Sequence, residues 1–206
     1  MSGKHELLEG IVLDRLETGE THLRISLYSP NVCLRLALLR LRKGNLSHPP
    51  PDIFDDVELS MNRRVDSNSI SFIKDFQILN KRTALACSHR CFYYASKVAR
   101  LFLDNGSLIQ DTVPTYQLII SSMEAFQKGL RPDLVWIKTL FRLGRAEGFA
   151  VKEDWLSNLK KREQEFAFNV LSKTVNMQNP SPSSVKELTQ SLSVWLYSET
   201  ELNCIV

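Results

Sequence analysis

The chain has 206 residues, of which 43% are hydrophobic and 24% charged, so it can bury a core in one domain or two small ones and is not expected to be disordered. Its formal net charge of +3 is mildly basic, which permits an anionic partner such as nucleic acid or an acidic peptide without requiring one. No apolar run approaches the roughly 18 residues that span a bilayer, and residues 1–10 lack the apolar stretch of a signal peptide, so no membrane contact and a cytoplasmic location are expected.

The first 80 residues have the pattern of short β-strands. A strand is predicted over residues 10–17, and it ends at the turn signal Thr18-Gly19. Residues 22–28 alternate polar and apolar side chains, which is typical of a half-buried strand. After a turn containing Pro30, a third strand is predicted over residues 32–42.

In this third strand the inward side chains are expected to be Val32, Leu34, Leu36 and Leu38. A loop with three consecutive prolines follows over residues 43–52, and two more strands are predicted over 53–61 and 69–79. Five short strands are the number in an OB-type barrel, but a small sandwich fits the same pattern. Periodicity therefore leaves both folds open.

From residue 83 onward the apolar spacing becomes helical. Helices are expected over residues 83–105, 114–127, 132–148, 159–176 and 184–197. Pro132 suits a first helical position, and Ser184 with Glu187 forms a capping-box pattern. The predicted fold class is α+β with two domains, in which residues 1–80 form a five-stranded OB barrel and residues 81–206 are all α.

Basic side chains of the first half are candidates for nucleic-acid contact. A surface that binds single strands needs cations near the phosphates and flat side chains on which bases stack. Tyr28 and Phe54 could provide stacking, although aromatic residues in strands more often belong to the core. The alternative for the cations is that they form the solvated surface of a soluble barrel. The predicted nucleic-acid contacts are Arg24, Arg35, Arg40, Arg42, Lys43, Arg63, Arg64, Lys81 and Arg82.

A cationic stripe is predicted on the third helix. Lys138, Arg142 and Arg145 are spaced i, i+4 and i+7, so they share one helix face. A cationic stripe beside an apolar groove suits an acidic peptide with an apolar end. The alternative is the wet side of an ordinary amphipathic helix. The predicted peptide contacts are Lys97, Arg100, Leu134, Lys138, Phe141, Arg142 and Arg145.

Metal and catalytic sites are not expected. Cys87 and Cys91 lie one helical turn apart, but His89 points away from both, and tetrahedral zinc needs four ligands. Cys33 and Cys204 are distant in sequence. The chain also lacks a nucleophile-elbow motif and a phosphate-binding glycine loop. We therefore expect no cofactor and no enzymatic activity.

Four segments, in this order, resemble the RecO family. EGIVLDRLETGET at residues 9–21 and ISLYSP at residues 25–30 resemble the first hairpin of its OB fold. SFIKDFQIL at residues 71–79 is similar to its last barrel strand, and EGFAVKEDW at residues 147–155 to the region that closes its long helix. The chain departs from many relatives because it lacks their zinc-binding insert of four cysteines, and it is shorter between Trp155 and the last helix.

The resemblance implies a mediator of DNA recombination and repair. Such proteins bind single- and double-stranded DNA, anneal complementary strands and contact the acidic C-terminal tail of the single-strand-binding protein. With RecR they help to load RecA, and this role implies association with the nucleoid.

The alternative function is a protein-interaction scaffold of the repair machinery that does not touch DNA. Residues 1–82 favour it, because they carry 12 Lys and Arg against 11 Asp and Glu. Clustering of the basic side chains on one face would favour DNA binding, and scattering would favour the scaffold.

Overall fold

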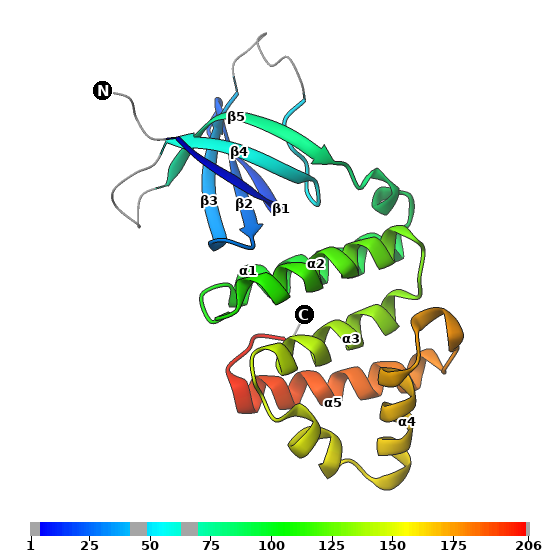
Figure 1. The fold of residues 1–206 in the computed structure, drawn as a ribbon. Helices are drawn as coiled ribbons and strands as arrows, with labels where there is room; N and C mark the ends of the chain where they lie inside the picture. The colour runs from blue at the N-terminus through cyan, green and yellow to red at the C-terminus, as the bar shows by residue number, and fades with distance from the viewer. Residues whose placement is uncertain (1–4, 42–48, 63–69, 205–206) are drawn as a thin grey trace. The chain divides into compact units, whose positions relative to one another are not determined.

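The computed structural model describes residues 5–41, 49–62 and 70–204 (Figure 1). The chain divides into two compact units, Met1–Arg82 and Thr83–Val206. The first unit contains the strands and the second the helices, so the predicted order of a barrel followed by a helical region is confirmed. The division falls two residues after the predicted position 80.

The first unit is a closed barrel, which rules out the sandwich. Its strands are β1 (His5–Thr18), β2 (His22–Ser29), β3 (Cys33–Arg40), β4 (Asp56–Asn62) and β5 (Ser71–Asn80). The order around the barrel is β1-β2-β3-β5-β4. β1 is long enough to pair with β4 along one half and with β2 along the other, and the parallel pairing of β3 with β5 closes the gap between the third and fifth strands.

Alternating side chains from all five strands fill the barrel. The core consists of Leu8, Val12, Leu23, Ile25, Leu27, Ala37, Leu39, Val57, Leu59, Met61 and Ile73. The predicted inward face of β3 is wrong, because Leu36 is 40% exposed while Ala37 is fully buried. The register with β2 decides this: Ala37 lies opposite Ile25 and Leu39 opposite Leu23, and both β2 residues face the core.

The fourth strand begins three residues later than predicted. Phe54 adopts a left-handed backbone with a φ of 69°, which a non-glycine residue rarely adopts. The backbone N–H of Asp52 donates to the Asp55 carboxylate at 3.0 Å, so the residues before β4 form a tight turn. Two backbone hydrogen bonds join this turn to Val12 of β1: the Phe54 N–H donates to the Val12 carbonyl at 2.7 Å, and the Val12 N–H donates to the Asp55 carbonyl at 2.9 Å.

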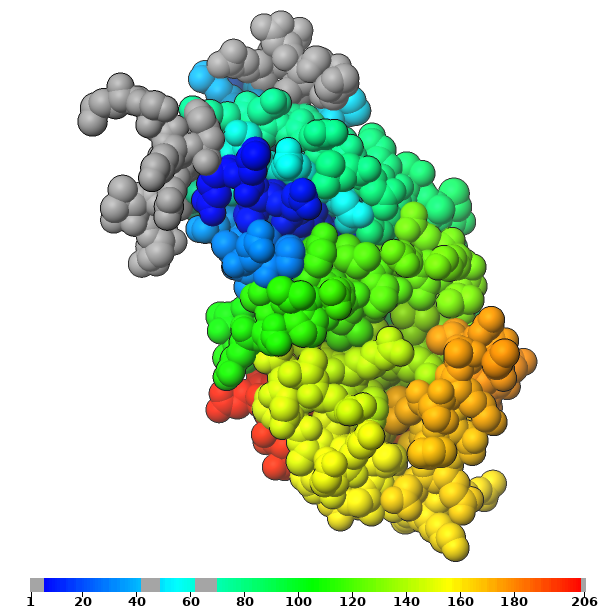
Figure 2. Space-filling model, viewed as in Figure 1, coloured from blue at the N-terminus to red at the C-terminus, as the bar shows by residue number. Residues whose placement is uncertain are grey.

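The second unit is a helical bundle arranged around α3. Its helices are α1 (His89–Asn105), α2 (Thr112–Gln127), α3 (Pro132–Ala146), α4 (Lys161–Ser172) and α5 (Pro182–Thr200). α3 contacts α1, α2, α4 and α5 and is buried along most of its length (Figure 1). Residues 150–180, in yellow to orange, form part of the outer surface of this unit (Figure 2).

A side-chain cap begins α1, and prolines begin α3 and α5. Ser88 accepts a hydrogen bond from the Cys91 N–H at 3.3 Å, so α1 begins at residue 89, while a short 3-10 turn occupies Thr83–Cys87. Pro132 begins α3 as predicted, but α5 begins at Pro182, two residues before the predicted capping box. Across the described ranges, no helix is both long and apolar enough to cross a membrane.

Candidate nucleic-acid interface

The outer side of β2 and β3 concentrates positive charge. The two strands contain three arginines, of which Arg24 and Arg40 lie on this side, and neither strand contains Asp or Glu. His22 lies opposite Arg40 in the register, and Arg24 lies opposite Leu38. Because side chains alternate along a strand, these residues lie on the face opposite the core residues Leu23 and Leu39. Arg24, His22 and Arg40 therefore share one outer face.

An aromatic ring and apolar side chains lie on the same outer face. Phe72 of β5 is the register partner of Leu38 and is 38% exposed. Its ring meets the His22 ring edge-on, with the centroids 6.1 Å apart. Leu36 on the neighbouring strand is also exposed. We call His22, Arg24, Leu36, Arg40 and Phe72 the β2–β3 face; it combines cations with flat and apolar groups.

The charge of Arg24 remains available to a ligand. Its guanidinium lies 3.7 Å from the Asp14 carboxylate, and both side chains are about two-fifths exposed. An exposed pair of this kind contributes roughly 0–1 kcal/mol, so a phosphate can replace the carboxylate at little cost. The Arg24 Nε is shielded from solvent and has no hydrogen-bond partner among the described residues.

Other predicted nucleic-acid contacts lie elsewhere. Arg35 lies two residues before Ala37 on β3, so it is on the inward side of the strand. Its Nε is shielded from solvent and has no hydrogen-bond partner in the described part of the chain. Lys81 is exposed, and its charge acts on Asp55. Burial raises the pKa of Asp55, and the Asp52 N–H and Lys81 oppose that rise. Four predicted contacts lie outside the described residues: Arg42, Lys43, Arg63 and Arg64.

Arg82 is a correction to the predicted interface. Its side chain is only 1% exposed. Nη1 donates to the Phe54 carbonyl at 2.7 Å and to the Asp56 carboxylate at 2.5 Å. A guanidinium held in this way cannot reach a phosphate, so Arg82 has a structural role. Tyr28 and Phe54 are also buried, so both rings belong to the protein interior and are not available for stacking on bases.

Sequence reasoning missed Phe72 and His22. Phe72 lies within the predicted last strand, but its neighbours are set by the parallel pairing of β5 with β3, whose residues lie more than 30 positions earlier. The alternating pattern of β2 does place His22 and Arg24 on the polar side of that strand. This alternation was the one signal that could have indicated the face.

A cationic groove lies between α2, α3 and the end of α4. It has a volume of about 400 Å³, and no Asp or Glu lines it. Its cations are Lys128, Lys138, Arg142 and Lys173. Its aliphatic lining is Leu118, Ala125, Leu130, Val135, Leu171 and Val175. We call this site the α2–α3 groove.

The groove contains two of the predicted peptide contacts. Lys138 Nζ donates to the carbonyls of Leu171 and Lys173 at 2.8 and 2.7 Å, which caps the end of α4. Burial lowers the pKa of Lys138, and the nearby Arg142 lowers it further. Arg145 is exposed but does not line the groove.

The predicted apolar flank of the stripe is a second correction. Leu134 is fully buried and Phe141 is 8% exposed, with its ring tilted against Trp155 at 6.4 Å between centroids. Both belong to the core because α3 is covered by other helices on several sides. Arg100 is exposed and pairs with Asp104 at 2.7 Å, one turn further along α1.

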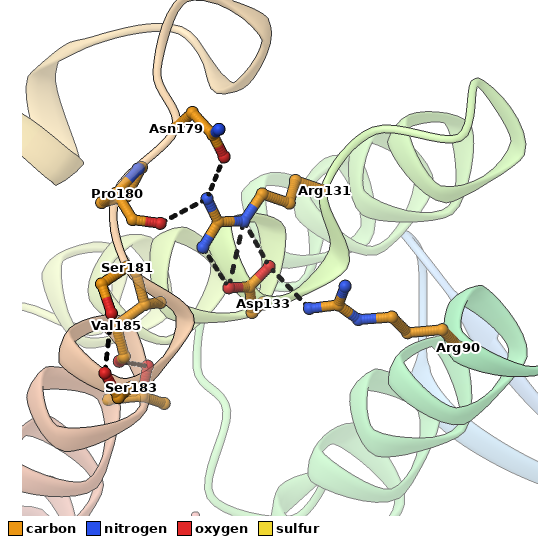
Figure 3. Close-up of polar contacts among 9 residues, drawn as sticks. Arg90, Arg131, Asp133, Asn179, Pro180, Ser181, Ser183 and Val185 are labelled. Carbon is orange, nitrogen blue, oxygen red and sulfur yellow. Dashed lines mark hydrogen bonds and ion pairs between the residues drawn. The ribbon is translucent and has the colours of Figure 1, made fainter.

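The remaining predicted peptide contact, Lys97, lies in a separate cleft between α1, α3 and α5. Its volume is about 620 Å³, and its lining includes Tyr93, Tyr94 and Trp136. One end of the cleft is fixed by an ion-pair network in which Asp133 accepts hydrogen bonds from Arg131 and Arg90 (Figure 3).

The cysteines do not converge. Cys87 is exposed at the end of the 3-10 turn, whereas Cys91 is buried in α1, so the two do not share one helix as predicted. Within the described ranges, no three side chains of the metal-binding types come close enough to hold an ion.

Comparison with models of known protein families finds no match for this chain, and comparison with curated proteins finds none either.

Proposed function

We propose that the barrel is an OB fold and that the chain binds single-stranded nucleic acid through the β2–β3 face. The arrangement of the strands supports this fold: the first three form a meander, and the fourth and fifth return so that β4 pairs with β1. OB folds bind oligonucleotides on the face of strands 2 and 3 and on the adjoining loops.

The observation that carries the proposal is the composition of the β2–β3 face. Arg24 and Arg40 would neutralise successive phosphates, and a base would stack on Phe72, beside His22. No carboxylate on β2 or β3 competes for these cations. Near-neutral barrels can bind nucleic acid when their cations are concentrated in this way, because phosphate contacts depend on local charge.

The biological role that we propose is mediation of recombinational repair, and it rests on the RecO resemblance. Cations bound to two backbones would reduce the repulsion between complementary strands and so favour annealing of single-stranded DNA; double-stranded DNA would bind through its phosphates alone. In this role the chain would act with RecR to load RecA onto DNA covered by the single-strand-binding protein.

The α2–α3 groove is the proposed docking site for the acidic tail of the single-strand-binding protein. Lys138 and Arg142 offer positive charge at its rim, and its aliphatic lining offers an environment for an apolar side chain. An anionic tail would also relieve the repulsion between these two cations, which contributes to the lowered pKa of Lys138.

The scaffold function remains the alternative, and the scattering of Arg35 and Arg82 away from the β2–β3 face favours it. Fluorescence anisotropy of a labelled oligothymidylate, titrated with the full chain, separates the two functions. We expect Arg40→Gln with Phe72→Ser to weaken binding at least about tenfold, since one stacked base contributes roughly 1–3 kcal/mol.

A matched control removes the same side-chain types from an exposed part of α4, by Arg162→Gln with Phe168→Ser. This control should bind like the wild type. If the wild type does not bind at low salt, the scaffold function is correct. If the β2–β3 variant binds as tightly as the control, the β2–β3 face is not the binding site.

A further inference from the structure

The cleft between α1, α3 and α5 has an unusual lining. We define the aromatic cleft by Arg90, Tyr93, Tyr94, Lys97, Trp136 and Lys186, all of which line it. It contains three cations and one carboxylate, that of Asp133. The surrounding side chains are mainly aromatic, hydroxyl or amide groups rather than aliphatic ones.

Lys97 lies at the centre of the rings. Its Nζ is 5.3 Å from the centroid of Tyr93, 5.5 Å from that of Trp136 and 5.9 Å from that of Tyr94. These distances are within the range of cation–π attraction, which holds the ammonium group in place. Trp136 is buried, whereas Tyr93 is 49% exposed. The cleft therefore has a fixed cation beside one ring that is open to solvent.

The carboxylate does not neutralise this charge. Asp133 accepts hydrogen bonds from Arg131 at 2.8 to 3.2 Å and from Arg90 at 3.3 Å (Figure 3). Arg131 is itself fixed by Asn179 and by the Pro180 carbonyl. Because Arg131 already balances Asp133, the cations that line the cleft are in excess and favour an anionic ligand.

We propose that the aromatic cleft is a second binding site for single-stranded nucleic acid. A base would stack on Tyr93, and the flanking phosphates would lie near Lys97 and Lys186. The hydroxyl of Ser193 and the amide of Gln190, which also line the cleft, can hydrogen-bond a base edge. Stacking beside cations is how proteins hold single strands without reading their sequence.

The lining favours nucleic acid over an acidic peptide. An apolar peptide end needs an aliphatic pocket, and Pro182 and Val194 are the aliphatic side chains lining this cleft. The α2–α3 groove, by contrast, has six aliphatic side chains in its lining. The two sites in the helical unit thus suit different partners.

This inference rests on the proposed function and extends it. With one site in the barrel unit and one in the helical unit, each chain would hold two strand segments at once. Annealing requires two strands to be held together, so the second site would supply the strand that the β2–β3 face does not hold.

The test is the number of short oligonucleotides bound per full-length chain. An oligothymidylate of about eight nucleotides is long enough to fill one such site. At low salt, titration followed by anisotropy should give two equivalents for the wild type, and one for Tyr93→Ser with Lys97→Gln. Arg40→Gln with Phe72→Ser should also leave one equivalent. The control Phe168→Ser with Lys161→Gln, on exposed α4 positions, should keep two.

Each outcome has a separate meaning. Two equivalents in the Tyr93 and Lys97 variant overturn the second site and leave the barrel proposal intact. Two equivalents in the Arg40 and Phe72 variant overturn the barrel site alone. If the Tyr93 and Lys97 variant instead loses only the binding of a labelled acidic peptide, the cleft is a peptide site.

Photo-crosslinking tests the same contact in the unaltered protein. An oligonucleotide carrying 5-iodouracil should crosslink to Tyr93, and mass spectrometry of the digested product would locate the modified residue. Crosslinks confined to residues of the barrel unit would overturn the inference even if the variants failed to fold.

Discussion

The buried guanidinium of Arg82 joins two parts of the barrel unit. It binds the carbonyl of Phe54, whose backbone is left-handed, and the carboxylate of Asp56 at the start of β4. The Asp56 side chain is 17% exposed, so the pair is largely desolvated. Removing one member of such a pair leaves the other charge buried without a partner, which is more costly than the pair is favourable.

We expect Arg82→Met to destabilise the barrel by about 3 kcal/mol, because it removes the Arg82 donor from the Phe54 carbonyl and the balancing cation from the Asp56 carboxylate, to which Asn80 still donates. The measurement is the free energy of unfolding from urea denaturation. Lys81→Met is the control, since that neighbouring side chain is exposed and should change stability by less than about 0.5 kcal/mol. Equal unfolding midpoints for the two variants would show that the buried pair is not structural.

At the scale of elements, the packing of β1 on β2 requires a glycine. A Cβ on Gly10 would lie 2.4 Å from the Tyr28 carbonyl oxygen and 2.8 Å from the Leu27 Cγ. The first of these atoms belongs to the backbone of the paired strand and cannot move without opening the ladder. Gly19, in the turn that follows β1, has open space around it but a φ of 64°.

Gly10→Ala should therefore destabilise the protein by at least about 2 kcal/mol through steric overlap. Gly19→Ala should cost only about 1 kcal/mol, since there the penalty is conformational. Thermal unfolding of both variants, monitored by circular dichroism, gives the comparison. The β1–β2 geometry is contradicted if Gly10→Ala unfolds at the same temperature as the wild type or above Gly19→Ala.

The Asn105 side chain holds the C-terminal segment to α1. Asn105 donates from Nδ2 to the Asn203 carbonyl at 3.0 Å and accepts from the Asn203 N–H at 2.7 Å. This places Cys204 in the interior, 2% exposed, where burial raises the pKa of its thiol to about 12. At neutral pH the thiol is therefore protonated and shielded, and both conditions slow alkylation.

We expect Asn105→Ala to increase the alkylation rate of Cys204 by iodoacetamide about thirtyfold. Two lost hydrogen bonds of about 1 kcal/mol each make local opening that much more frequent. Peptide mass spectrometry would follow Cys204, with the exposed Cys87 as an internal standard. Asn169→Ala is the control, because Asn169 also donates to the carbonyl four residues earlier but lies on exposed α4. An unchanged rate at Cys204 would mean that Asn105 does not hold the segment.

The sequence predicted the order of elements but not every face. The buried face of β2 is predictable because polar and apolar residues alternate along the strand. β3 contains the run LRLALLR, which has leucines on both faces. Only its pairing with β2 sets which leucines face inward. The predicted start of α5 is also wrong. Ser184 and Glu187 have the residue types and spacing of a capping box, but the helix already begins at Pro182.

The candidate interface was predicted in part. Arg24 and Arg40 are both predicted contacts, but the predicted inward face of the third strand would turn Arg40 toward the core; the register with β2 instead places both on one outer face. Arg82 was misassigned because its partner Asp56 is 26 residues earlier in the chain, and no local pattern indicates that contact. Phe72 joins the face only through the parallel pairing that closes the barrel. Residues whose neighbours come from distant strands are the ones that sequence reasoning misplaced.

At the scale of the whole molecule, cations and rings should contribute differently to binding. Each phosphate contact releases counterions, so for single strands the logarithm of the binding constant falls with the logarithm of salt concentration by about 0.7 per contact. Stacking on a ring releases no counterions and does not depend on salt in this way. The two kinds of contact on the β2–β3 face can therefore be separated in one set of titrations.

Measured in the Lys97→Gln with Tyr93→Ser background, so that the barrel site alone is observed, Arg40→Gln should reduce the salt slope by about 0.7. Phe72→Ser should instead weaken binding by roughly 1–3 kcal/mol at every salt concentration, with an unchanged slope. Anisotropy titrations at four or more salt concentrations provide both quantities. If Phe72→Ser changed the slope and Arg40→Gln did not, the two residues would not contact base and phosphate as proposed. Coincident lines for all variants would place the strand on another part of the barrel, because the β2–β3 face combines this arginine and this ring on adjacent strands.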